Sequence, residues 1–207
     1  MCHAEFWVNV AVAVGTVGAV LAALFGKWFR ANVFPPNLSL RLHNPKGELT
    51  REGPVGGPPV EDARYYHLKV SNSRRFSPAH DVRVVLLRVE EPGPNGELQV
   101  TWTGDIPIVW RHQAVFPILR TIGSEAYADL CSVRQSKILR IHPLIGPYNL
   151  KAQWNRACIM MLTLQAKGTE VDSKPLRVSI AWDGEWEPGE TEMRRRLQVD
   201  EANEQVD

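Results

Sequence analysis

The chain has 207 residues, which is enough for one domain of ordinary size plus a short additional segment. Its 24 Lys and Arg residues nearly cancel its 23 Asp and Glu residues, so no global field attracts nucleic acid, and we expect no nucleic-acid partner. The three cysteines, Cys2, Cys131 and Cys158, are odd in number and far apart. This spacing favours free, buried thiols over a disulfide framework, with one Cys131–Cys158 bridge as the alternative.

The first predicted element is a hydrophobic helix within residues 1–30. From Phe6 to Phe25 the sequence has no charged side chain, and such a helix, rising about 1.5 Å per residue, spans the roughly 30 Å hydrocarbon layer of a bilayer. A buried core helix is typically shorter, and a cleavable signal peptide has a basic N-terminal region that this chain lacks. The pattern therefore predicts one uncleaved N-terminal transmembrane helix that anchors the chain in the cell membrane.

The flanks of this helix predict its placement in the membrane. Trp7 and Trp28 stand near its two ends, where aromatic rings favour the headgroup level, and Lys27 and Arg30 are charged anchors at the second end. No Lys or Arg precedes the apolar stretch. Because Lys and Arg beside a membrane helix tend to stay in the cytoplasm, we expect the domain that follows to be cytoplasmic.

Small residues recur along the predicted membrane helix at close to four-residue spacing. They form a candidate association face of Ala11, Gly15, Gly18, Ala19 and Ala22. Small side chains let helix backbones approach closely in lipid, so this face predicts self-association or contact with another membrane helix. The alternative is that Gly and Ala are simply frequent in membrane helices.

Residues 31–63 are predicted to be a partly structured linker. Pro35 and Pro36 cannot continue the helix and favour an extended exit from the membrane. A first strand is expected over 38–42, where apolar and polar side chains alternate, and a Pro- and Gly-rich loop is expected between His43 and Asp62.

A β-sandwich domain is predicted over residues 64–189. Its expected strands, beyond the first, cover 65–70, 81–89, 98–102, 106–110, 128–133, 138–142, 158–165 and 176–182. Turns separate these segments and no long amphipathic helix lies between them, so the class is mainly β: an antiparallel immunoglobulin-like β-sandwich preceded by one N-terminal transmembrane helix. Residues 190–207 are expected to form a short helix, with Met193 and Leu197 facing the sandwich, followed by a frayed acidic tail.

One hairpin resembles a known family. Residues 66–89, YHLKVSNSRRFSPAHDVRVVLLRV, give an alternating strand, an Asn at its end, a polar loop, Pro-Ala and a valine-rich strand. This order resembles bacterial immunoglobulin-like domains of the cell-adhesion-related (CARDB) type. The resemblance implies that Asn72 shapes the turn and that Ala79 and Val82 enter the core; it covers one hairpin and indicates a fold rather than a function. The family is mostly extracellular, which leaves the compartment open.

The chain contains no linear motif for catalysis, for metal binding or for phosphate binding. Its histidines form no HxH or HExxH arrangement, no Gly-x-Ser-x-Gly elbow is present, and no cofactor is expected. His80 beside Asp81 is not expected to form a catalytic pair, because neighbouring strand residues point to opposite faces. The enzyme alternative is a non-linear site built from His67, Asp81 or His142.

The loop between two predicted strands is a candidate partner-binding site. It presents Arg74, Arg75 and Phe76, and arginine beside an exposed aromatic ring is typical of interface anchors. The alternative is a solvated loop whose Phe76 folds back onto the sandwich edge.

These features lead to a functional hypothesis of a single-pass, membrane-tethered, non-catalytic β-sandwich. It is expected to bind a protein partner or to form homo-oligomers at the cytoplasmic membrane surface. The first alternative is an envelope or adhesion-type module on the outer side of the membrane. The second is the small membrane-bound enzyme, and the third is a subunit of a larger membrane complex that makes contact through the small-residue helix face.

Overall fold

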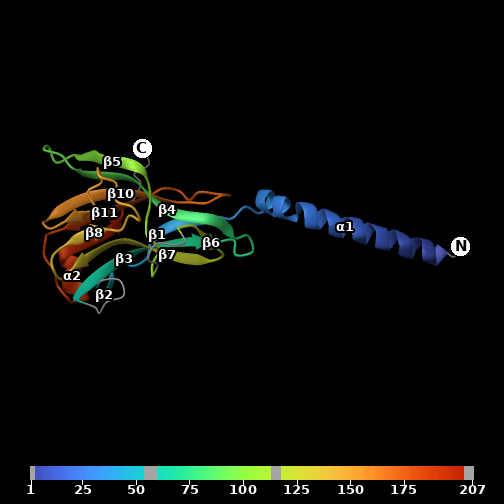
Figure 1. Ribbon diagram of the computed structural model, residues 1–207, viewed down its shortest axis with the longest axis horizontal. Coiled ribbons are helices and arrows are strands. Elements are labelled where there is room, and N and C mark those ends of the chain that lie inside the picture. Colours follow the sequence, from blue (N-terminus) through green and yellow to red (C-terminus); the bar gives the residue numbers. More distant parts are fainter. Residues whose placement is uncertain (1–2, 54–59, 113–117, 203–207) are drawn as a thin grey trace.

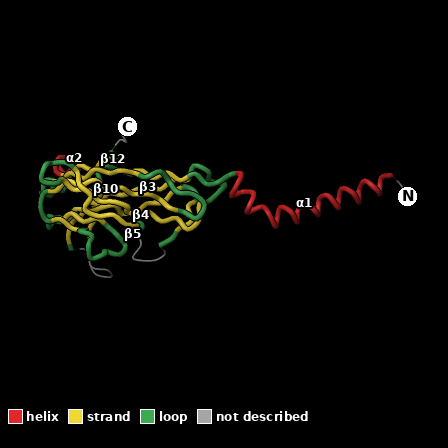
Figure 2. The backbone as a smooth tube through the Cα atoms, turned by 90° about the horizontal axis from the view of Figure 1, so that it is seen from above, coloured by secondary structure: helices red, strands yellow, loops and turns green. Residues whose placement is uncertain are grey.

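The structure consists of one long helix and one two-layered β-sandwich (Figure 1). This computed structural model describes residues 3–53, 60–112 and 118–202. Helix α1 (His3–Val33) runs away from the sandwich, and the N-terminus lies at its far end (Figure 1). In the view of Figure 2 the strands lie in layers and α1 projects from one end of them.

The first sheet is antiparallel and is organised around its longest strand, β3. It contains β1 (Leu38–Leu42), β2 (Glu48–Glu52), β3 (Glu61–Asn72), β7 (Glu125–Arg134), β8 (Leu139–Ile141) and β9 (Gln153–Trp154). One edge of β3 is shared, because β1 pairs with its last five residues and β2 with its first five. The other edge of β3 pairs with β7.

The second sheet is also antiparallel and packs against the first. It contains β4 (Ala79–Pro92), β5 (Leu98–Pro107), β6 (Arg120–Ile122), β10 (Cys158–Lys167), β11 (Leu176–Trp182) and β12 (Leu197–Glu201). The short helix α2 (Glu190–Arg196) leads directly into β12. The mainly β, antiparallel sandwich that the sequence predicted is therefore confirmed.

The core lies between the two sheets and follows the period-two pattern of the strands. Tyr66 and Leu68 of β3 are fully buried, as are Leu86 of β4 and Leu164 of β10. Burying one such side chain contributes roughly 1.5–3 kcal/mol, which makes the inward faces of these strands the main source of stability. The outward face of β3 carries Tyr65 and other polar side chains, because successive residues of a strand point to opposite faces of the sheet.

The prediction of a loop between residues 43 and 62 is wrong in its middle. Strand β2 lies within it and pairs with β3, and β3 itself begins at Glu61. Backbone pairing and ion pairs hold β2, including contacts from Arg51 to Asp62 and from Arg134 to Glu52. The sequence of β2 shows no alternation of apolar and polar residues, so the pattern could not predict this edge strand.

The prediction of a strand over 106–110 is only partly correct. Strand β5 ends at Pro107, which has no backbone N–H to continue the pairing. The next residues cross to the first sheet, where Trp110 forms an isolated bridge with Ala128. The segment 108–111 thus extends the first sheet beside the first half of β7.

The C-terminal prediction is right for the helix and wrong for the start of the tail. Met193 and Leu197 are fully buried against the sandwich, as expected. However, the helix ends at Arg196, and Val199 is buried on β12, which pairs with β11 through Glu201. The strands of the sandwich therefore run from Leu38 to Glu201, beyond the predicted limits of 64 and 189. The remainder of the predicted tail, residues 203–207, lies outside the described residues.

Among the residues whose placement is described, the structure has no helix that is both long enough and apolar enough to cross a membrane.

Candidate functional site

The exit of α1 is fastened to the β3–β4 loop. The Asn37 backbone N–H donates to Asn72 Oδ1 at 3.1 Å, and the Asn37 side chain donates to Ser73 Oγ at 2.9 Å. Arg74 Nη1 donates to the Pro35 carbonyl at 3.0 Å. The junction that the sequence assigned to a partly structured linker is therefore built into the end of the sandwich.

Asn72 organises this junction from a buried position. Its amide group donates to the carbonyls of Ser77 and Ile122 at 2.8 and 3.1 Å, and its oxygen accepts from the Arg74 backbone N–H at 3.1 Å. Asn72 is 3% exposed, so each of these bonds replaces a lost bond to water. Ala79 and Val82 of β4 are fully buried in the core. Asn72 thus lies at the turn, and Ala79 and Val82 lie in the core, as the resemblance of the hairpin 66–89 predicted.

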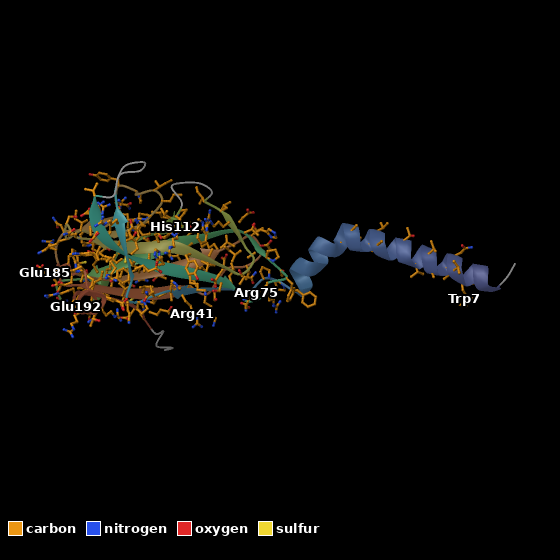
Figure 3. The ribbon with its side chains drawn as sticks, turned by 90° about the horizontal axis from the view of Figure 1, so that it is seen from below. Trp7, Arg41, Arg75, His112, Glu185 and Glu192 are labelled. Carbon is orange, nitrogen blue, oxygen red and sulfur yellow. The ribbon has the colours of Figure 1, made fainter. Side chains whose placement is uncertain are left out.

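The predicted partner loop separates into a structural residue and two surface residues. Arg74 is engaged with Pro35, whereas Arg75 and Phe76 are exposed. Phe76 does not fold back onto the sandwich edge; it is 65% exposed, and its ring meets the Phe34 ring edge-on at 5.8 Å between centroids. Arg75 lies at the end of the sandwich that faces α1 (Figure 3).

Helix α1 presents its described side chains to the surroundings. Trp7 and Phe25 are 62% and 53% exposed. A Cβ placed on Gly15 or Gly18 meets no atom within 4 Å, so no described part of this chain occupies the small-residue face at those positions. The side chains of Ala22, Lys27, Trp28 and Arg30 lie outside the described residues.

A polar cleft of about 390 Å³ opens on the outer face of the first sheet. It is lined by Glu48, Leu49, Thr50, Arg51, Tyr65, His67, Arg111, His112 and Asp129. These residues come from β2, β3, β7 and the segment beside β7, so the cleft lies across four neighbouring segments of one sheet.

An ion pair between Glu48 and Arg111 closes over a buried histidine in this cleft. Glu48 lies on β2 and Arg111 lies beyond β7, so strands β3 and β7 run between their backbones. Arg111 Nη2 is nevertheless 2.5 Å from Glu48 Oε2, and that oxygen is 3.8 Å from His67 Nε2. His67 Nδ1 pairs with Asp129 Oδ1 at 2.9 Å, and His67 is 4% exposed.

Tyr65 separates this histidine from a second one. Its ring stacks on His67 and on His142, with centroids 6.1 and 5.2 Å apart. Burial and the nearby Glu52 carboxylate raise the pKa of the Tyr65 hydroxyl well above its usual value. Burial lowers the pKa of His142 to about 4, and its Nε2 lies 2.8 Å from Ser132 Oγ. At neutral pH the Tyr65 hydroxyl and the His142 ring are therefore uncharged.

The structure does not assemble the proposed three-residue enzyme site. His67 and His142 share the outer face of the first sheet, but the Asp81 carboxylate accepts a hydrogen bond from Thr169 at 3.0 Å beside the second sheet. The expectation that His80 and Asp81 point to opposite faces is wrong. Asp81 has φ 52 and interrupts the alternation of β4, so both residues contact the loop after β10. The His80 Nδ1 atom lies 2.5 Å from Glu170 Oε1.

The two described cysteines are free thiols, as the first interpretation of their spacing expected. Cys131 is fully buried in the core and Cys158 is half-buried. Burial raises the pKa of Cys131 far above its usual value and that of Cys158 to about 11. Neither thiol is activated as a nucleophile.

No protein-family model matches the chain, and a search of curated proteins returns no relative.

Most of the cleft could not be predicted from the linear sequence. Its charged residues lie on separate segments between 48 and 129, and only the strand pairing brings them together. The alternation of Tyr65 and His67 with the core residues of β3 was the one available signal, because it predicts that both rings share the outer face of a strand.

Proposed function

We propose that this chain is a single-pass membrane protein whose non-catalytic β-sandwich binds a protein partner, or assembles with its own copies, at the cytoplasmic surface of the cell membrane. The carrying observation is α1, a 31-residue helix that leaves the sandwich and exposes its apolar side chains. Its stretch from Phe6 to Phe25 has no charged residue. A bilayer is the environment in which such a surface is stabilised.

The composition of α1 supports lipid over water as its surroundings. Five valines on this helix, Val8, Val12, Val14, Val17 and Val20, are between 50% and 66% exposed. Valine is a poor helix former in water, and a helix with exposed apolar side chains on every side gains nothing there. In lipid the helix is favoured because all its backbone groups must pair internally. Thr16, one of the two polar residues between Phe6 and Phe25, donates its hydroxyl to the Val12 carbonyl at 2.8 Å.

The sandwich is proposed to be of the immunoglobulin-like, cell-adhesion-related type. Support comes from the hairpin 66–89, in which Asn72 fixes the turn and Ala79 and Val82 are buried. Such a scaffold supplies binding loops rather than chemistry.

Self-assembly through the small-residue face can be tested in the full chain. Gly15→Leu with Gly18→Leu adds bulk to an open surface, so the monomer keeps its fold. Two differently tagged copies are expected to co-purify from mild detergent, and the double variant is expected to lose this association because the backbones can no longer approach. Ala13→Leu, on the opposite side of the helix, serves as the control. Unchanged co-purification of the double variant would reject self-assembly through this face.

The side of the membrane can be tested by thiol labelling. Cys131 is fully buried, so a single engineered thiol at the highly exposed Tyr148 is the better reporter, in a chain that lacks Cys2 and Cys158. A membrane-impermeant maleimide is expected to label Tyr148→Cys only after cells are permeabilised. Labelling of intact cells would instead favour the outer-side alternative that the cell-adhesion resemblance supports.

A further inference from the structure

We infer that the end of the sandwich next to α1 rests on the lipid headgroups of the membrane and binds anionic lipid through Arg75 and Phe76. This inference depends on the proposed insertion of α1. It goes further because it assigns a lipid-contacting surface to the sandwich and fixes which end of the domain faces the bilayer.

The surface consists of two aromatic rings and one cation at the foot of the helix. Phe34 is the first residue after α1 and is 45% exposed, and its ring touches that of Phe76, which is 65% exposed. The Arg75 side chain is exposed beside them (Figure 3). Aromatic rings with an adjacent arginine are the side chains that favour the boundary between headgroups and water.

This surface is fastened to the segment that directly follows α1. The bonds from Asn37 to Asn72 and from Arg74 to Pro35 hold the loop against the helix exit. Only Phe34 separates the end of α1 from this hydrogen-bonded segment, so the loop stays next to the end of the helix. Insertion of α1 therefore brings Phe76 to a defined height above the membrane.

The length of the helix determines that height. Phe34 lies nine positions after Phe25, the end of the uncharged stretch, and a helix rises about 14 Å over nine residues. The headgroup layer is roughly 5–8 Å thick on each side. Phe34 thus lies just beyond the headgroups, too far for the rings to enter the acyl chains. The long Arg75 side chain reaches back, and attraction to anionic lipid acts over about 8 Å at physiological salt.

Two acidic groups in the loop after β10 are engaged with neighbouring groups of the sandwich. The Glu170 carboxylate accepts from the His80 backbone at 2.9 Å and contacts its ring. Asp172 accepts from the Gly168 backbone at 3.2 Å.

The test uses the full chain in vesicles of phosphatidylcholine with phosphatidylserine. A nitrobenzoxadiazole fluorophore is attached at Ser124→Cys, in the exposed turn beside Asn72, or at Glu192→Cys on α2, at the opposite end of the sandwich (Figure 3). Cys2 and Cys158 are replaced in both proteins. Lipids that carry a spin label on the headgroup quench a fluorophore that touches the headgroup layer.

The inference predicts strong quenching at residue 124 and little at residue 192. Arg75→Glu should reduce the quenching at 124 several-fold, whereas Arg195→Glu, an exposed arginine on α2, should not change it. Vesicles without phosphatidylserine should give the same reduction as Arg75→Glu. Equal, weak quenching at both sites in protein that floats with the vesicles would overturn the headgroup contact and leave the anchor standing. Protein that does not float would overturn both.

Discussion

The Asn37 backbone N–H donates a hydrogen bond to the Asn72 side-chain oxygen at 3.1 Å, across 35 residues of sequence. This bond joins the exit of α1 to the turn between β3 and β4. It connects the proposed anchor to the sandwich directly, so the stability of the domain and the position of the helix depend on the same buried amide.

Replacement of Asn72 by Ala is expected to destabilise the sandwich strongly. The change leaves the Ser77 and Ile122 carbonyls without their donor in a buried site, at a cost of about 2–4 kcal/mol. Urea unfolding of the detergent-solubilised chain measures this cost. Ser73→Ala is the control, because it removes one exposed bond to the Asn37 side chain and should cost under about 1 kcal/mol. Equal losses in the two variants would contradict a special role for Asn72.

The neutral state of His142 predicts a dependence of stability on acid. Its folded-state pKa of about 4 lies below the unfolded value of 6.5, so protonation favours the unfolded chain. The stability that it contributes is fully present above pH 6.5 and is lost as the pH falls toward 4; the loss amounts to at most about 3 kcal/mol. His142→Gln should therefore lose less stability than the parent between pH 7 and pH 4.5. Parallel losses in the two proteins would show that His142 is not the titrating group.

The bridge from Glu48 to Arg111 is expected to contribute more than an ordinary surface ion pair. The two side chains are 34% and 27% exposed, whereas Arg51, which pairs with Asp62, is 75% exposed. Arg111→Ala should cost about 1–2 kcal/mol because it also uncovers His67, and Arg51→Ala should cost under about 0.5 kcal/mol. Urea unfolding at neutral pH measures both. A cost for Arg111→Ala no larger than that for Arg51→Ala would argue against the bridge.

Lys137 occupies a backbone conformation that suits glycine. Its φ is 58, and it closes the turn between β7 and β8 by donating to the Arg134 carbonyl. Left-handed conformation costs an L-residue about 1–2 kcal/mol, and glycine's greater freedom in the unfolded chain offsets part of the gain. Lys137→Gly should therefore be about 0.5–1 kcal/mol more stable than Lys137→Ala by thermal or urea unfolding. Both variants lose the same exposed contact with Glu185. The reverse order would indicate that this backbone is not strained.

Sequence reasoning located the elements that bury an apolar face and missed those that do not. Strands such as β10 alternate clearly and were predicted because their inward side chains form the core. Strand β2 has four charged or polar residues in five and is defined by pairing, which the linear pattern does not carry. Similarly, β12 was hidden because Asp200 and Glu201, near its end, resemble a solvated tail.

The surface features were predictable only where sequence neighbours stay neighbours in space. Arg74, Arg75 and Phe76 were predicted together as a candidate binding loop, and of the three Arg75 and Phe76 are exposed. The bond of Arg74 to Pro35 and the bridge from Glu48 to Arg111 join residues far apart in the chain. Such contacts depend on strand order, and no local pattern encodes strand order.

The central claim, that α1 holds the sandwich at a membrane, is tested most directly by extraction of the full-length chain from cell membranes. The account predicts that the chain stays with the membrane in alkaline carbonate and is released by detergent. Val12→Arg with Val17→Arg should move it to the soluble fraction, because each charge near the helix centre costs about 2.5–3.5 kcal/mol on insertion scales. Recovery of the unaltered chain in the soluble fraction without detergent would contradict the claim.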